Sequence, residues 1–475
     1  MTLKSLPFFL FIFLSVKSFS QNQKDVYTIM DANAEKITKN SGAYSVSIGI
    51  LKDGKIYTKH YGEIDKGKKN KANDETYFEI ASVTKVMTGQ LLAKAVVDGK
   101  INLDDDIRKY LKGDYPNLEY NGVPVKIKNI VAYNSALPRT LPDDEKLYKN
   151  ITSETPFLLK KLSGTYSRDQ FFKDLKNVKL KGLPGIEYNY SNLSLELTGV
   201  ILENVYGKSI EKLFEENILS RLKMQHTQFG AYKTVSVANG YHDGKLMPHF
   251  ESNLWSSSGM KTISSMGDLM KFMKDELYSK DKVVLESQKN IDNSKENWHS
   301  YFWDNFYVSE YGKVGYKHGG AYGTQTWFTI YPELKMGICI IVNNSTPTTF
   351  PVLQNAAGEI MEDFTKSSDA KEIYGYTLKG NSILFSYIHP KNLDAGLLNT
   401  VSIAGSFNDW NSENKEYQMI QKDKNRFELE VPMSKFEKGK TYSFKFVLNK
   451  SGWISAPQRA SNADGTLDKN LMLKL

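Results

Sequence analysis

Residues 78–92 read FEIASVTKVMTGQLL, and this stretch decides how the rest of the chain is interpreted. It places Ser82 and Lys85 three positions apart, so their side chains share one face of the predicted helix. The lysine can then take the proton of the serine hydroxyl, provided that its amine is held neutral. We therefore predict that Ser82 is an activated nucleophile.

The surroundings of Lys85 distinguish it from other lysines at the same spacing. Its helical neighbours Ala81 and Gly89 are small, whereas Met87 and Leu91 supply an apolar face for burial. An ammonium group in such a crevice has its pKa lowered by up to ~3–5 units, as a base working near neutral pH requires. The alternative is a solvated helix lysine. The same Ser-x-x-Lys spacing also begins at Ser209, Ser220, Ser258, Ser279, Ser368 and Ser412.

Residues 77–88 resemble the nucleophile helix of the serine β-lactamase and penicillin-binding-protein family, in the branch of class C β-lactamases, D-alanyl-D-alanine carboxypeptidases and related esterases. Residues 46–57, VSIGILKDGKIY, are similar to the opening β-hairpin of that branch, with two strands around an Asp-Gly turn. The resemblance runs from about residue 26 to residue 363. It implies an α+β fold in which helices flank an antiparallel sheet, with a cleft between the sheet and a helical subdomain.

The second motif of that family, Tyr-x-Asn, is matched by Tyr190 and Asn192 within LPGIEYNYSN, residues 183–192. The same spacing at residues 115–117 and 148–150 lacks a preceding Pro-Gly turn and a following apolar helix. The resemblance implies that Tyr190 passes a proton between the serine, the lysine and the leaving group. Asn192 would donate to the substrate carbonyl or hold the lysine. The alternative for Tyr190 is a core tyrosine with a satisfied hydroxyl.

The third motif, Lys-Thr-Gly or His-x-Gly on a strand that lines the cleft, is matched by His318, Gly319 and Gly320. The two glycines would let a substrate lie against the strand backbone. The N–H of Ala321 would complete an oxyanion hole with the N–H of the nucleophile, and such a donor is worth ~10²–10³-fold in rate. A competing register begins at Lys317, and we predict the one that begins at His318.

Two departures from the family pattern bear on the substrate. The middle position of the third motif is usually Thr or Ser, whose hydroxyl helps to bind a substrate carboxylate, and here we place Gly319 at that position. Residues 133–137 read YNSAL where the family usually has His-Thr-Ser-Gly-Leu. We therefore predict an ester, or an amide with an uncharged end, in preference to D-Ala-D-Ala peptides or β-lactams.

The first twenty residues predict an export signal, with a basic start, an apolar run over residues 6–16 and small residues before the expected cleavage site. We expect the mature chain to begin at Gln21 and the protein to be periplasmic or secreted. The apolar run is shorter than the roughly 18 residues of a membrane span. We therefore predict no stable span after cleavage, with an uncleaved anchor as the alternative.

Composition excludes several other classes of function. The net charge of +8 is spread along the 475 residues rather than gathered in one block, so nothing favours nucleic-acid binding. Cys339 is the only cysteine, which rules out an intrachain disulfide and predicts a buried structural thiol. The 7 histidines form no metal-binding motif and no phosphate-binding glycine loop is present, so we expect neither a metal nor a cofactor.

Near residue 365 the pattern changes from mixed elements to short alternating strands at residues 382–387, 400–404, 426–431 and 442–448. We predict an all-β, immunoglobulin-like sandwich after the hydrolase domain. The expected division is a signal peptide over 1–20, a hydrolase domain over 21–365, a linker over 366–376 and a sandwich over 377–475.

Residues 401–411, VSIAGSFNDWN, resemble the glycogen-binding module of AMP-activated kinase β subunits and the early-set domains of branching and debranching enzymes. That resemblance implies that Trp410 and Trp453 stack on sugar rings and that Lys445 bonds a hydroxyl, with Asp468 in a further binding position. The module would then bind α-glucan. The alternative is that the two tryptophans are core residues, because each buries a large apolar area.

Together these features predict an exported serine hydrolase that acts through an acyl-enzyme on an ester or amide. An esterase or a D-amino-acid-peptide hydrolase fits best, acting on a small molecule or on an ester or amide derived from cell wall or glycan. The alternatives are a D-alanyl-D-alanine carboxypeptidase or β-lactamase proper, and a non-catalytic, penicillin-binding-protein-like glycan binder.

Overall fold

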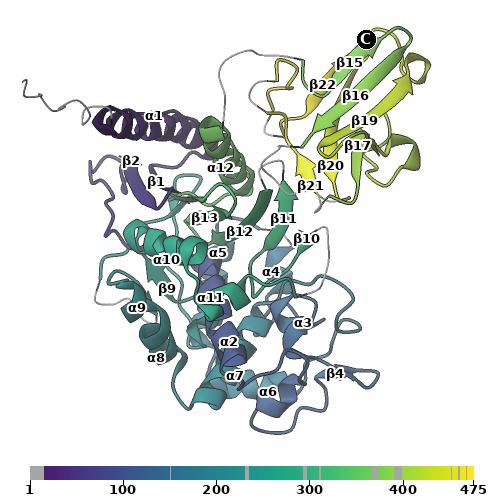
Figure 1. The fold of residues 1–475 in the computed structure, drawn as a ribbon. Coiled ribbons are helices and arrows are strands. Elements are labelled where there is room, and N and C mark those ends of the chain that lie inside the picture. Colours follow the sequence, from purple (N-terminus) through teal and green to yellow (C-terminus); the bar gives the residue numbers. More distant parts are fainter. Residues whose placement is uncertain are drawn as a thin grey trace, which may run out of the picture.

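The computed structural model contains a larger body built around a seven-stranded sheet and a smaller body of two four-stranded sheets at the C-terminal end (Figure 1). It describes residues 15–149, 151–229, 235–291, 297–309, 312–365, 373–389, 398–450, 452–457, 460–466 and 468–475, without the side chains of residues 15–25 and 297.

The larger body carries the helices and the first fourteen strands. Its helices are α1 (Ser15–Ser41), α2 (Thr84–Val97), α3 (Ile127–Val131), α4 (Glu145–Tyr148), α5 (Thr155–Thr165), α6 (Arg168–Leu175), α7 (Asn192–Tyr206), α8 (Ile210–Phe214), α9 (Ser220–Leu222), α10 (Met266–Tyr278), α11 (Lys282–Ser287) and α12 (Thr349–Thr365). Its strands are β1 (Ser45–Lys52), β2 (Lys55–Gly62), β3 (Phe78–Glu79), β4 (Glu119–Tyr120), β5 (Val123–Pro124), β6 (Gln228–Phe229), β7 (Tyr241–His242), β8 (Lys245–Leu246), β9 (Thr262–Ser264), β10 (Asn297–Trp298), β11 (Asn305–Ser309), β12 (Gly312–Gly320), β13 (Gln325–Tyr331) and β14 (Met336–Val342).

The central sheet is antiparallel, in the order β10-β11-β12-β13-β14-β1-β2, so the N-terminal hairpin lies beside a strand from the end of the larger body. The hairpin turns at Asp53 and Gly54, whose φ angles of 48° and 79° suit the predicted Asp-Gly turn. Alternate residues of β1 pack under α1 and α12, while Gly49 on the other face approaches two methionines of α10. The sheet is thus covered by helices on both faces, which confirms the predicted α+β fold.

Strand β3 leads into a short 3-10 turn, Ala81–Val83, and α2 follows directly. Ser82 therefore lies in the turn and Lys85 in the first turn of the α-helix, rather than both in one regular helix as the sequence predicted. Ala81 has a φ of 43°, in the left-handed region that residues with a side chain rarely adopt. Helix α2 is buried on almost every side, which fixes the turn at the centre of the larger body.

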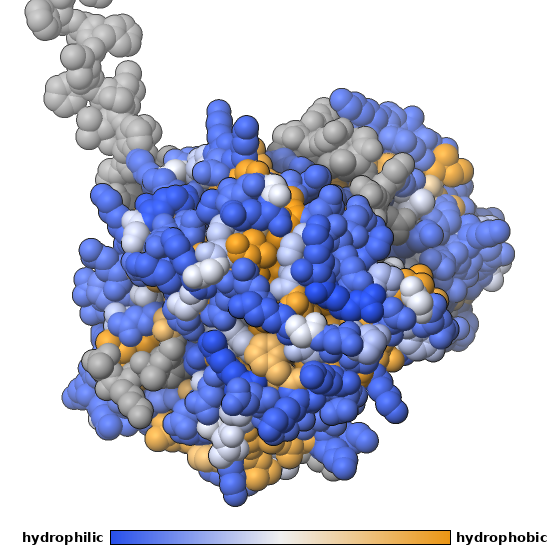
Figure 2. All heavy atoms as spheres, turned by 90° about the horizontal axis from the view of Figure 1, so that it is seen from below, coloured by the Kyte–Doolittle hydropathy of each residue, from blue (hydrophilic) through white to orange (hydrophobic). Residues whose placement is uncertain are grey.

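The helical subdomain, which includes α2, α3, α6 and α7, lies at the end of the larger body that is lowest in Figure 1. Seen from that end, the surface is mainly hydrophilic, with apolar residues in separate patches (Figure 2). None of the helices in the part of the chain that the structure describes is long and apolar enough to cross a membrane.

The smaller body is a sandwich, as predicted. One sheet has the order β15-β16-β19-β18, and in the other β20 pairs with β17, β21 and β22. Aromatic side chains from the two sheets meet between them, for example Phe385 and Phe444 with ring centroids 5.3 Å apart. The predicted strands agree with the observed ones to within one residue at each end. The strands are β15 (Tyr376–Lys379), β16 (Ser382–Ile388), β17 (Val401–Gly405), β18 (Ile420–Gln421), β19 (Arg426–Pro432), β20 (Thr441–Leu448), β21 (Gly452–Ile454) and β22 (Leu471–Lys474).

Described residues of the sandwich contact the larger body through an ion pair and a close backbone approach, among other contacts. Glu359 of α12 pairs with Lys36 of α1 at 2.5 Å and with Lys469 of the sandwich at 2.8 Å. Gly452 at the start of β21 lies so close to β11 that an added Cβ would be 3.3 Å from the Val308 carbonyl oxygen. Of the predicted linker, residues 366–372 lie outside the described residues, and so do residues 1–14 of the predicted signal peptide.

Candidate active site

The structure brings the side chains of Ser82 and Lys85 together. Lys85 Nζ donates a hydrogen bond to Ser82 Oγ at 2.9 Å and another to the carbonyl oxygen of Ser258. The lysine side chain is 1% exposed, and burial, followed by the charge of Lys317, holds its pKa well below the usual value. A neutral amine beside the hydroxyl is the arrangement that general-base activation of the serine requires.

Tyr190 completes a hydrogen-bonded trio with the serine and the lysine. Its hydroxyl lies 2.8 Å from Ser82 Oγ, and burial raises the pKa of the phenol, which therefore keeps its proton at neutral pH. The local sequence fixes this position: Ser191 caps α7 by accepting from the Ser194 N–H, and its hydroxyl donates to the Pro138 carbonyl at 2.7 Å. Tyr190 can thus exchange a proton with Ser82.

Asn192 lies in the first turn of α7 and lines the same cavity as Ser82. Its backbone N–H donates to the Arg139 carbonyl at 2.6 Å. Within the described part of the chain, no hydrogen bond links the Asn192 side chain to Lys85. The expected role of holding the lysine therefore has no support here, and a role toward the substrate carbonyl stays a prediction.

The structure corrects the register predicted for strand β12. His318 does not line the cavity: its Nε2 lies 2.9 Å from Gln325 Oε1, and its ring meets Phe350 edge-on at 4.9 Å. Lys317, one residue earlier, points to the opposite face of the sheet, where its Nζ lies 5.3 Å from the centroid of the Tyr190 ring. Because side chains alternate along a strand, a shift of one residue changes the face.

Lys317 is held by two residues that the sequence did not identify. Its Nζ donates to Asp304 Oδ1 at 2.5 Å and to the Tyr133 hydroxyl at 3.0 Å, and the lysine is fully buried. The ring of Tyr133 stacks on the ring of Tyr190, with centroids 5.0 Å apart. Tyr133 is the first residue of segment 133–137, which stands where the family usually has His-Thr-Ser-Gly-Leu. That correspondence was the one indication in the sequence that Tyr133 lies near the site. Asp304 carried no signal in the sequence.

The residues after Lys317 determine which backbone groups can meet a substrate oxygen. Gly319 faces the nucleophile turn, the 3-10 turn Ala81–Val83 that holds Ser82. A Cβ added at Gly319 would lie 2.2 Å from the carbonyl oxygen of Ile80, which immediately precedes this turn. The N–H of Ala321 is donated to the Thr324 carbonyl at 2.9 Å, so Ala321 is not the predicted oxyanion donor. Gly320 lines the cavity together with Ser82, which makes its N–H the candidate partner of the Ser82 N–H.

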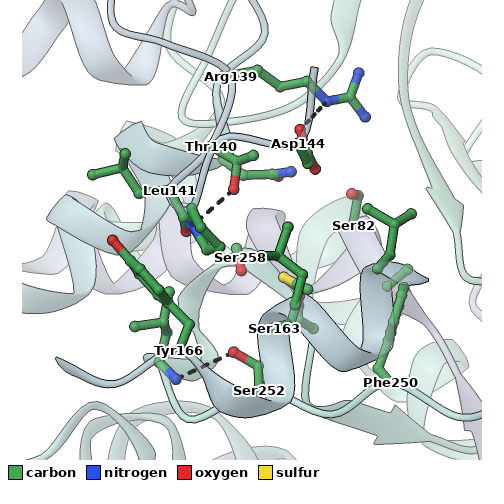
Figure 3. Close-up of a pocket in the computed structure, with 18 of the residues that line it drawn as sticks. Ser82, Arg139, Thr140, Leu141, Asp144, Ser163, Tyr166, Phe250, Ser252 and Ser258 are labelled. Atoms are coloured by element: carbon green, nitrogen blue, oxygen red, sulfur yellow. Dashed lines mark hydrogen bonds and ion pairs between the residues drawn. The ribbon is translucent and has the colours of Figure 1, made fainter. Parts of the chain in front are cut away.

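Ser82 opens into a cavity of about 140 Å³ between the sheet and the helical subdomain. Figure 3 shows Ser82 on one side of this space, Arg139 and Asp144 along one edge and Tyr166 on the far side. Arg139 Nε lies 4.0 Å from Asp144 Oδ1, and neither of these buried atoms has a hydrogen-bond partner among the residues that the structure describes. Burial raises the pKa of Asp144 to about 6, against the opposing effect of Arg139. The guanidinium carbon of Arg139 lies 4.0 Å from the centroid of the Tyr148 ring, so the cation sits between this ring and Asp144 at the edge of the cavity.

The residues that the sequence assigned to sugar binding lie on the sandwich. Lys445, Trp453 and Asp468 line one cavity, whose other wall is formed by the larger body. Trp410 does not line this cavity, although its ring centroid is 6.2 Å from that of Trp453. The two tryptophans are 36% and 43% exposed, so they are not core residues. Among the residues described, no group of three His, Cys, Asp or Glu side chains could hold a metal ion.

Comparisons with known proteins identify the family and several relatives of this chain. The sequence profile of the family described as Beta-lactamase matches residues 30–359. Protein flp of Staphylococcus aureus strain COL is 27% identical over 337 residues, which cover 68% of this chain and 64% of that protein. Protein flp of strain NCTC 8325 is 28% identical over 341 residues with the same coverage. The chain thus spans less than two thirds of the length of these relatives.

Two further proteins share part of the sequence or the fold. The D-alanyl-D-alanine-carboxypeptidase/endopeptidase AmpH of Escherichia coli K12 is 31% identical over 201 residues, which cover 42% of this chain and 49% of that protein. The crystal structure of a beta-lactamase/D-alanine carboxypeptidase from Yersinia pestis complexed with citrate superposes with a TM-score of 0.60 at 20% identity. It covers 73% of this chain and 100% of the other.

Proposed function

Because the chain belongs to the beta-lactamase family, we propose that it is an exported serine hydrolase that forms an acyl-enzyme on Ser82. The observation that carries this proposal is the hydrogen-bonded trio: Ser82 Oγ lies 2.9 Å from Lys85 Nζ and 2.8 Å from the Tyr190 hydroxyl, and the lysine is buried. The intact trio argues against a non-catalytic glycan binder. Export rests on the sequence of residues 1–20 alone.

The proposed reaction begins with attack of Ser82 Oγ on the substrate carbonyl carbon, while the hydroxyl proton moves to neutral Lys85 Nζ. The N–H groups of Ser82 and Gly320 would stabilise the negative oxygen of the tetrahedral intermediate. The proton then passes through the Tyr190 hydroxyl to the leaving alcohol or amine, and the bond to that group breaks. Water attacks the acyl-enzyme by the same route in reverse, which releases the acid and restores Ser82.

The preferred substrate class in this proposal is an ester or an amide with an uncharged end. With the corrected register, the middle position of the third motif is held by His318, not Gly319. Its imidazole bonds Gln325 and faces away from the cavity, so no hydroxyl of β12 is offered to a substrate carboxylate at this position. A substrate with an uncharged end is therefore still favoured, with His318 in place of Gly319 as the residue at this position.

A D-alanyl-D-alanine carboxypeptidase is the second candidate, and one observation favours it. Arg139 places a cation at the edge of the cavity, and an arginine is well suited to bind a terminal carboxylate. The AmpH relative is named for that activity. The two candidates differ in the charge of the group beside the scissile bond, which an experiment can vary.

Intact-protein mass spectrometry tests both the nucleophile and the substrate class. The protein is incubated with a fluorophosphonate, with penicillin, and with matched esters that either lack or carry a carboxylate beside the scissile bond. The proposal predicts one covalent adduct with the fluorophosphonate and a higher kcat/KM for the uncharged ester. A higher kcat/KM for the carboxylate-bearing substrate, with D-Ala-D-Ala cleavage, would favour the carboxypeptidase. No adduct with any probe would reject the acyl-enzyme.

For the sandwich, the predicted α-glucan binding also remains a proposal. The exposure of Trp410 and Trp453 supports it, because surface tryptophans are free to stack on a ring. Affinity electrophoresis of the full chain in glycogen should show retardation that Trp453→Ala removes, while thermal unfolding stays unchanged. If the full chain migrates equally far in gels with and without glycogen, the sandwich has no glucan-binding role.

A further inference from the structure

Asp304 lies just before β11 and contacts β12 through three bonds. Its Oδ1 accepts from Lys317 Nζ at 2.5 Å, its Oδ2 accepts from the His318 N–H at 2.8 Å, and its own N–H donates to the Tyr316 carbonyl at 3.1 Å. One carboxylate thus holds both the side chain of residue 317 and the backbone of residue 318. Asp304 itself does not line the cavity of Ser82.

The Lys317 side chain, which Asp304 holds, is in direct contact with the Ser82 centre, the hydrogen-bonded trio of Ser82, Lys85 and Tyr190. Lys317 Nζ lies 5.2 Å from the ring centroid of Tyr133 and 5.3 Å from that of Tyr190, and these two rings stack on each other. The Tyr190 hydroxyl in turn lies 2.8 Å from Ser82 Oγ. A chain of contacts therefore runs from the carboxylate through the ammonium and a phenol to the nucleophile.

The charge of Lys317 also acts on Lys85. After burial, it is the largest influence that lowers the pKa of Lys85, and it exceeds the opposing influence of Asp304 itself. A buried ammonium needs a partner, since removing one member of a buried pair leaves an uncompensated charge. Without Asp304, Lys317 would lose its proton or its position. The other charged groups that bear on Lys85 are Glu196 and Arg139.

We propose that Asp304 is a positioning residue of the Ser82 centre: it holds the Lys317 ammonium against the stacked rings of Tyr133 and Tyr190, and so fixes the Tyr190 phenol beside the nucleophile. This inference rests on the proposed acyl-enzyme function. It assigns to Asp304 an effect on acylation that passes through Lys317, with no contact between Asp304 and the substrate.

The test is the rate of covalent labelling of Ser82 by a fluorophosphonate in the full chain, for Asp304→Asn, Lys317→Met and the double variant. Asp304→Asn should slow labelling by about 10²-fold, the cost of a small misplacement of reacting groups. The double variant should label at the rate of Lys317→Met alone, because the ammonium through which Asp304 acts is then absent and the amide oxygen of Asn can still accept from the His318 N–H. A further loss in the double variant, or wild-type labelling of Asp304→Asn, would overturn the proposal.

A pH profile separates this role from a merely structural one. Labelling requires neutral Lys85, so the rate falls as pH drops below the Lys85 pKa. Loss of the neighbouring cation raises that pKa, so the acid limb should move to higher pH in Lys317→Met. The shift should have the same sign but be smaller in Asp304→Asn, because the carboxylate that is removed itself raises the Lys85 pKa. The matched control is Asp268→Asn, which removes a buried carboxylate paired with Lys271 at 2.8 Å outside the cavity. It should lower the melting temperature without moving the acid limb.

Two outcomes keep the inference separate from the function on which it rests. If the wild-type chain is not labelled at all, the acyl-enzyme proposal fails. If Ser82 is labelled but Asp304→Asn leaves both the rate and the acid limb unchanged, the positioning role fails alone. Should Asp304→Asn not fold, Lys317→Met decides, because it contains no lone buried ammonium at position 317. Labelling of Lys317→Met at the wild-type rate would overturn the proposal, since Asp304 is proposed to act only through Lys317.

Discussion

At the scale of single residues, Ser82 is distinguished from the other serines with a lysine three positions later by where its hydroxyl lies. We expect Ser82→Ala to abolish labelling by a fluorophosphonate, as measured by intact mass. The matched control is Ser220→Ala, which changes an exposed serine of the same spacing on α9, and it should label like the wild type. A labelled peptide that contains any serine other than Ser82 would contradict the assignment.

Lys85 gives the reaction a pH dependence with a definite sign. Its pKa lies well below 10.5, and the amine acts as a base only when it is neutral. The value of kcat/KM should therefore be level above that pKa and fall as pH drops through it. Lys85→Arg keeps a positive charge at every working pH, so acylation should slow by at least ~10²-fold throughout the profile. An arginine variant with substantial activity would exclude Lys85 as the base.

The register of β12 predicts which of two neighbouring residues matters more. Lys317 lies against Tyr190 and Tyr133, whereas His318 lies on the other face beside Gln325 and Phe350. Lys317→Ala should therefore slow acylation more than His318→Ala, in single-turnover measurements with an ester. This is the reverse of the order that the sequence-based register implies. Equal effects of the two substitutions would show that the reaction does not depend on which face of β12 the side chain occupies.

The residues of the site differ in how far the sequence could reveal them. Ser82, Lys85 and Tyr190 stand in short motifs whose spacing and flanking residues are visible along the chain. The choice of Lys317 or His318 as the first residue of the third motif depends on which face of β12 packs toward Ser82. The residue types alone do not decide this orientation. Asp304 has no motif at all, because its place is set by a backbone turn and by pairing with a strand that follows it.

At the scale of elements, two adjacent glycines of β12 provide a matched pair. A Cβ at position 319 would meet the Ile80 carbonyl oxygen at 2.2 Å, whereas at position 320 the nearest atom is His318 Cε1 at 3.5 Å. Gly319→Ala should lower the free energy of unfolding by about 1–3 kcal/mol through overpacking and should slow labelling of Ser82. Gly320→Ala keeps its N–H and should unfold like the wild type in denaturant titrations. Equal stability of the two variants would contradict the close approach.

The elements themselves were predictable where one face of a strand is buried. In the sandwich, alternation of apolar and polar residues located β16, β17, β19 and β20 almost to the residue. The turn that holds Ser82 was not predictable, because its residues are compatible with a regular helix. Its 3-10 geometry and the positive φ of Ala81 arise from packing against neighbouring elements, including Gly259, whose added Cβ would lie 2.1 Å from the Ala81 carbonyl oxygen.

At the scale of the whole molecule, the sandwich and the larger body share a contact surface, which we expect to stabilise both. Lys469 pairs with Glu359 of α12, and Gly452 rests against Val308 of β11. A chain that ends near residue 365 should keep turnover of a soluble ester, because every residue of the Ser82 cavity precedes that point. It should melt at a lower temperature than the full chain in differential scanning fluorimetry. Identical melting temperatures would mean that the shared surface contributes no stability.

The pairing of β1 with β14 has a consequence for how the molecule is made. Val46 meets Val342 across the sheet, so the hairpin of β1 and β2 has no further strand to pair with until the last strand of the larger body has been synthesised. Helices α2 to α11 are synthesised between β1 and β14. The sheet closes late, through contacts of long sequence separation, which slows folding. Lys317 and Asp304 belong to the late-emerging half, so the nucleophile turn gains its full surroundings only when synthesis of the larger body is nearly complete.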